Sequence, residues 1–123
     1  MKKYSQSVIV ASLSLLFAAT VPVHAFEADA AQALFKQNDC AKCHSVDKTK
    51  KGPSLKTMAL KYKGKADGQE KIIQKMTTAT KIKSQDGTEE EHKVIGTKDP
   101  KELKNLADWI LSQQADDLAL SAG

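Results

Sequence analysis

Two cysteines and a histidine lie close together in the sequence Cys40-Ala41-Lys42-Cys43-His44. Two thiols three positions apart reach the same side of one helical turn, where they can form thioether bonds to the two vinyl groups of a porphyrin. The imidazole that follows directly can then coordinate the iron. This order of residues is typical of c-type haem attachment. We therefore expect one covalently bound haem c, with Cys40 and Cys43 as attachment points and His44 as an iron ligand.

Other chemistries of a cysteine pair fit the sequence less well. A thioredoxin-like redox pair lies near a βαβ pattern, and no segment here has the alternation expected of a strand. A zinc site needs about four ligands, and beyond the motif only the distant His92 adds a Cys or His after residue 25. A disulfide across so short a loop would constrain the chain little. Haem attachment is therefore the leading interpretation.

The first 25 residues have the composition of a secretory signal peptide. They begin with a positive charge at residues 1–3, continue with an apolar run over residues 8–19, and end in Val23-His24-Ala25, with the small Ala25 at the expected cleavage site. We expect cleavage after Ala25, export to the periplasm and no membrane association afterwards. An uncleaved anchor helix is the alternative, but the run before Pro22 is shorter than the about 20 residues that a spanning helix needs.

Composition narrows the function classes. The chain has 123 residues and a formal net charge of +4, and all 19 of its basic residues are lysines. Nucleic-acid recognition depends on the arginine guanidinium and on aromatic stacking, so a chain without arginine and with 5% aromatics is a poor candidate for it. Without the leader, residues 26–123 carry a charge of +2. We expect them to form one monomeric domain that gains part of its core from the porphyrin.

Helical patterns cover most of this domain. Apolar residues at helical spacing predict a helix leading into Cys40, a short helix from residue 55 that ends at Gly64, and another within 68–78. Residues 79–98 have mixed charge without a clear period, so we predict mainly a loop there. Residues 115–123 are expected to form a flexible tail.

The last helix has the clearest signals. Asp99 is the expected N-cap, Pro100 takes the first helical position, and Glu102 would complete a capping box. Apolar residues at helical spacing then predict the buried face. This face comprises Leu103, Leu106, Ala107, Ile110 and Leu111.

Together these motifs resemble the class I bacterial c-type cytochromes, which are small periplasmic electron carriers with one haem. Three stretches carry the resemblance: Ala33-Leu34-Phe35-Lys36-Gln37 before the cysteine motif, Gly52-Pro53-Ser54-Leu55, and Leu106-Ala107-Asp108-Trp109-Ile110-Leu111. The resemblance spans about residues 28–114 and implies an all-α fold whose N- and C-terminal helices cross around the haem. It also implies that the Pro53 carbonyl accepts a hydrogen bond from the His44 ring; from the residues alone, Pro53 serves equally well as the end of a loop.

The sixth iron ligand is the point at which the chain departs from this family. Relatives usually place a Met in a Pro-rich loop before the last helix, whereas residues 89–97 contain none. His92 occupies about that position, 17 residues before Trp109. We therefore hypothesise that His44 and His92 are the two axial ligands. Because a thioether ligand raises the haem potential, this pair implies a lower potential than in Met-ligated relatives.

Other candidates for the sixth position remain open. Met76 and Met58 both lie at apolar helical positions, where Met commonly fills gaps in a core. Lys93 would have to lose a proton before its amine could bind iron. A solvent-facing His92 would leave the sixth site open or weakly closed, and the protein would then bind small ligands.

Seven lysines and no acidic residue lie between Lys48 and Lys65. Such a run forms either a solvated face or, because it starts just after the haem motif, a rim that steers acidic redox partners. Electron transfer between redox proteins, such as a periplasmic dehydrogenase or reductase, is the leading function hypothesis. We expect no enzyme activity, since no general acid or base is placed near the iron. A haem-based sensor that binds CO or NO is the alternative.

Overall fold

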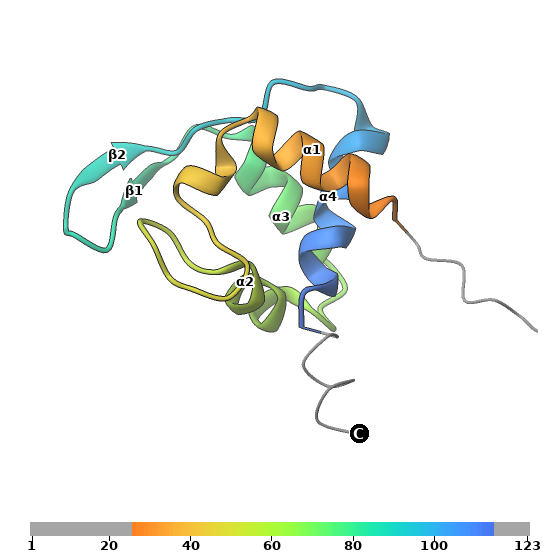
Figure 1. Ribbon diagram of the computed structural model, residues 1–123, viewed down its shortest axis with the longest axis horizontal. Coiled ribbons are helices and arrows are strands. Elements are labelled where there is room, and N and C mark those ends of the chain that lie inside the picture. The colour runs from red at the N-terminus through yellow and green to blue at the C-terminus, as the bar shows by residue number, and fades with distance from the viewer. Residues whose placement is uncertain (1–25, 115–123) are drawn as a thin grey trace, which may run out of the picture.

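A computed structural model describes residues 26–114 (Figure 1). The expected signal peptide (1–25) and tail (115–123) lie outside the described residues. The elements in chain order are α1 (Ala28–Gln37), the 3-10 turn η1 (Cys40–Lys42), α2 (Leu55–Tyr62), α3 (Gly68–Thr77), β1 (Lys81–Lys83), β2 (Glu89–Glu91) and α4 (Pro100–Ser112). Within this part of the chain, no helix has the length and apolarity needed to cross a bilayer. The predicted, mainly helical fold is confirmed.

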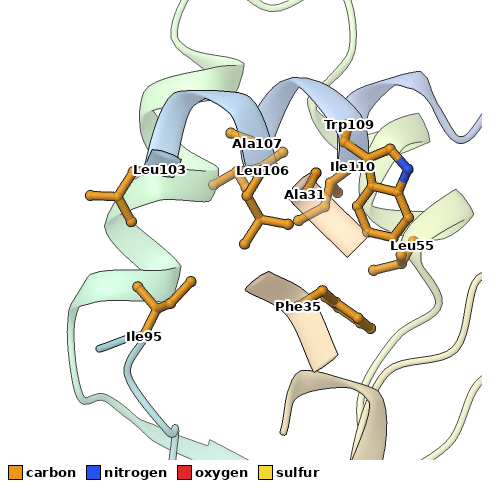
Figure 2. Close-up of a cluster of buried hydrophobic side chains, with 10 residues drawn as sticks. Ala31, Phe35, Leu55, Ile95, Leu103, Leu106, Ala107, Trp109 and Ile110 are labelled. Carbon is orange, nitrogen blue, oxygen red and sulfur yellow. The ribbon is translucent and has the colours of Figure 1, made fainter. Parts of the chain in front are cut away.

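The core forms where α1 crosses α4, with α2 and α3 also packed against α4 (Figure 1). Phe35 of α1 meets Trp109 of α4 edge to face, with ring centroids 5.6 Å apart. Leu106 and Leu55 are fully buried beside them (Figure 2). The predicted crossing of the first and last helices is therefore present, and buried apolar side chains fill the contact between them.

The start of α4 confirms two of the three predicted start signals, Asp99 and Pro100, and corrects the third. The Asp99 side chain accepts a hydrogen bond from the Lys101 amide at 2.9 Å, and Pro100 begins the helix. The Glu102 carboxylate, however, accepts a hydrogen bond from the Thr97 hydroxyl rather than closing a capping box on Asp99. The Thr97 hydroxyl takes that place, since it accepts from the Asp99 amide at 3.1 Å.

The buried face of α4 agrees with the prediction except at its end. Leu103, Leu106, Ala107 and Ile110 are buried, whereas Leu111 is only half-buried. Trp109 is buried in addition, because α1 covers it through Phe35.

A β-hairpin corrects the prediction of a loop over residues 79–98. β1 and β2 pair antiparallel, with Lys81 opposite Glu91 and Lys83 opposite Glu89. At its tip, Gly87 has a left-handed φ of 86°, and the Asp86 side chain accepts from the Thr88 amide at 3.0 Å. The strands escape prediction because each has three residues and is largely charged, so no apolar alternation marks them.

Replacing the buried Leu106 by Ala should destabilise the fold strongly. The side chain is fully buried in the α1–α4 core, and such a change typically costs about 2–5 kcal/mol of unfolding free energy. Leu60 on α2 is a matched control, because it is 61% exposed. Chemical denaturation should show a large loss for Leu106→Ala and little change for Leu60→Ala; equal losses would contradict this description of the core.

Candidate functional site

The cysteine motif forms a tight turn directly after α1. Asp39 adopts a left-handed conformation with φ of 57°, which turns the chain from the end of α1 into η1. The carbonyl of Cys40 then accepts from the amides of both Cys43 and His44, at 3.1 and 2.9 Å. This turn gathers two thiols and one imidazole. The thiols are not joined in a disulfide, and burial raises the pKa of the Cys40 thiol.

The ring of His44 is held by the segment that follows it. Its Nδ1 donates a hydrogen bond to the Pro53 carbonyl at 2.7 Å, because a carbonyl oxygen can only accept. This is the contact that the resemblance implies. With Nδ1 protonated, Nε2 carries the lone pair that a metal needs.

Gly52 supplies the room for this ring. A Cβ at position 52 would fall 2.5 Å from Cε1 of His44 and 2.9 Å from Nδ1, closer than non-bonded atoms approach. The Gly52 amide also donates to the Cys43 carbonyl at 2.9 Å, which ties the turn to the loop. The sequence signalled a chain break at Gly52-Pro53, but not this steric role.

The second imidazole, His92, follows β2 directly. Its amide donates to the Thr80 carbonyl at 2.8 Å, so the start of β1 positions its backbone. Its ring lies opposite that of His44, with centroids 6.2 Å apart and planes at 54°. Two imidazole–metal bonds of about 2.0 Å place the two bound nitrogens about 4 Å apart and the ring centres about 6 Å apart. The observed spacing therefore fits one metal ion between the rings.

The surroundings of His92 fit the same arrangement. Its Nδ1 is buried and has no hydrogen-bond partner within residues 26–114. A buried polar atom without a partner is costly, and a metal ion bound at Nδ1 would satisfy it. Burial, followed by the charges of His44 and Lys75, lowers the pKa of His92. The neutral imidazole that this favours is the form that binds metals.

The other candidate ligands make different contacts. The Nζ atom of Lys93 lies 2.7 Å from an Asp39 carboxylate oxygen, so an ion pair holds this amine. Met58 and Met76 are partly buried and pack against the core cluster.

The hairpin that precedes His92 is tethered to the loop that follows His44. The Gln85 amide donates to the Lys51 carbonyl at 3.2 Å. The buried Ser84 hydroxyl donates to a Glu90 carboxylate oxygen at 2.7 Å, and the same oxygen lies 3.9 Å from the Lys51 amine. These contacts connect the two chain segments that carry the imidazoles. The Asp86-Gly87 dipeptide was the available sequence signal for this hairpin.

Comparison with known proteins identifies the family. The family model for cytochrome c matches residues 28–114. The chain belongs to the cytochrome c family. It is 35% identical to cytochrome c-551 of Pseudomonas denitrificans over 66% of its own length and 94% of that protein. It is also 31% identical to cytochrome c-551 of Pseudomonas aeruginosa, over 85% of its length and 96% of that protein.

Solved structures agree with this assignment. The class 1 cytochrome MtoD of Sideroxydans lithotrophicus ES-1 is 53% identical, covers 73% of this cytochrome and 99% of its own chain, and superposes with a TM-score of 0.70. Cytochrome c552 of Nitrosomonas europaea is 30% identical, with a TM-score of 0.53 over 67% of this chain and 98% of its own.

Membership of the family establishes the cofactor and the general role. The cytochrome binds haem c covalently through Cys40 and Cys43, and it is an electron-transfer protein that works with redox partners rather than an enzyme. The half-buried thiols and the facing imidazoles are consistent with this haem.

Introducing a side chain at Gly52 should disturb the site. In Gly52→Ala, the new Cβ collides with the His44 ring, so we expect a weaker Pro53 hydrogen bond and a smaller low-spin fraction in the absorption spectrum of the haem-loaded protein. Gly64→Ala is the control, because a Cβ at this left-handed position has no neighbouring atom within 4 Å, so the change can strain the backbone but not the His44 ring. A wild-type spectrum and haem content in Gly52→Ala would contradict the steric role.

Proposed function

We propose that this cytochrome carries single electrons in the periplasm with His44 and His92 as its two axial ligands. The observation that carries the proposal is the 6.2 Å separation of the two imidazole rings. The signal-peptide-like composition of residues 1–25 supports export. The mature protein would then consist of residues 26–123 as one domain.

The chain's contribution is to hold two neutral imidazoles in fixed positions. The Pro53 carbonyl orients the His44 ring and makes it more basic. The backbone bond from His92 to Thr80 fixes the base of the opposing ring. When bound, haem supplies an iron that cycles between two oxidation states. Two protein ligands held in fixed positions would keep the coordination of that iron nearly unchanged during electron transfer.

The choice of an imidazole over a thioether also affects the potential. A Met ligand raises the haem potential, and His92 replaces it in this proposal. We therefore infer a lower potential than that of Met-ligated cytochromes of the same fold.

Spectra of the ferric protein test this ligand pair. The wild type should lack the near-infrared charge-transfer band that a sulfur ligand produces, and His92→Ala should convert the haem to a largely high-spin form. His92→Met should restore low-spin character and raise the midpoint potential. A near-infrared band that persists in His92→Ala but disappears in Met76→Ala would show that Met76 is the ligand.

A lysine surface is the proposed docking site for a redox partner. It comprises Lys48, Lys50, Lys51, Lys56, Lys61, Lys63 and Lys65. The Lys50 amine donates to the Ala41 carbonyl at 2.7 Å, inside the haem attachment motif, so this surface begins at the site. Leu60 of α2, next to Lys61 in the sequence, is 61% exposed and offers an apolar contact. Lysines together with an exposed apolar residue suit a transient partner with an acidic surface.

The oxidation kinetics of the ferrous protein should report this surface. With ferricyanide, an anionic oxidant, the rate should fall as ionic strength rises, and Lys48→Glu and Lys63→Glu should slow it at low salt. Lys101→Glu is the control, because it changes net charge equally at the start of α4, away from α2 (Figure 1). A cationic cobalt(III) tris(phenanthroline) oxidant should show the opposite trends. Equal effects of all three substitutions would show that the rate depends on the net charge of the protein and not on this lysine surface.

A further inference from the structure

Two consecutive residues between α1 and Cys40 bind the chain segment that contains His92. We call residues 92–96 the distal segment. Asn38 and Asp39 are more than fifty positions away from it in the sequence, yet both reach it through their side chains. These two residues thus connect the haem attachment motif to the opposite side of the site.

Asn38 uses both ends of its amide. Its Nδ2 donates to the Leu34 carbonyl at 2.8 Å, and the same carbonyl at the end of α1 also accepts from the Asn38 amide at 3.2 Å. Its Oδ1 accepts from the Gly96 amide at 2.9 Å. One part-buried side chain therefore joins the helix that leads into the motif to the end of the distal segment.

Asp39 adds a second connection. One carboxylate oxygen lies 2.7 Å from the amine of Lys93, the residue after His92. The other lies 3.2 Å from the amine of Lys42, within the motif itself. The left-handed backbone of Asp39, which Asp tolerates better than most residues, turns the chain from α1 into η1.

We propose that Asn38 and Asp39 are positioning residues that keep His92 against the site by holding the distal segment to the attachment motif. The inference rests on the proposed role of His92 as the sixth ligand. Neither residue touches the cofactor in this proposal; each acts through the backbone or side chain of the distal segment.

The other backbone hydrogen bonds of the distal segment are made to residues at the end of α3 and before β1. The His92 amide donates to Thr80, and the Ile95 amide donates to Met76 at 2.8 Å. Ile95 is buried in the core. These bonds join the segment to α3 and the start of β1, but none joins it to the motif. Asn38 and Asp39 supply that link, so they limit how far His92 can move away from His44.

Carbon monoxide binding to the ferrous, haem-loaded protein tests the proposal, because CO can bind only after the sixth ligand leaves. We compare wild type, His92→Ala, Asn38→Ala and Lys93→Gln by stopped-flow absorption. Loss of one hydrogen bond corresponds to about a 2- to 10-fold change in an equilibrium, and loss of an exposed ion pair to about 1.5- to 5-fold. We expect the CO-binding rate to rise by such factors in Asn38→Ala and Lys93→Gln.

Two controls separate positioning from general effects. Lys104→Gln removes an ion pair with Asp108 on α4, and Asp67→Asn removes an exposed ion pair of 2.8 Å with Lys71 on α3. Both should bind CO at the wild-type rate. Because Lys93 is 64% exposed, Lys93→Gln is expected to fold and load haem even if Asn38→Ala does not.

The outcomes distinguish the two proposals. If His92→Ala binds CO much faster than wild type but Lys93→Gln and Asn38→Ala match wild type, the positioning role is wrong and the ligand assignment stands. If wild type already binds CO as fast as His92→Ala, His92 is not the sixth ligand, and both proposals are overturned in favour of an open site.

Discussion

The facing of two imidazole rings at 6.2 Å is the constraint on which the site depends. In the proposed bis-histidine site, both rings have to stay within bonding distance of the iron of a haem held covalently at Cys40 and Cys43. Different contacts hold the two imidazole rings in place. A carbonyl and the missing side chain of Gly52 orient His44. A hairpin and a short buried segment bring His92 from far along the sequence.

The parts of the site that could be predicted are those that depend on local sequence. The order of thiols and imidazole in the motif specifies its chemistry by itself, and the start of α4 follows from Asp99 and Pro100 within a few residues. In both cases the deciding atoms lie within one or two turns of chain. The hypothesis about His92 had another source, since it came from the family resemblance and the position of His92 17 residues before Trp109.

The parts that could not be predicted depend on contacts between distant residues. The role of Gly52 becomes visible only when the His44 ring lies over it. The bond of Asn38 to Gly96, 58 positions later, has no local signal in the sequence. The hairpin strands are short and charged, and only their pairing shows that lysines lie opposite glutamates and that Glu90 lies near Lys51. The Asp99 amide donates to the Thr97 hydroxyl and not to the Glu102 carboxylate that the capping-box pattern predicts.

The crossing of α1 and α4 also sets an order of events in folding. Phe35 and Trp109 lie near opposite ends of the described chain, and contacts so distant in sequence form slowly, since a long loop must close first. Until the last helix docks, Phe35 lacks the Trp109 ring against which it packs, so the helix that leads into Cys40 has not yet gained its contact with α4.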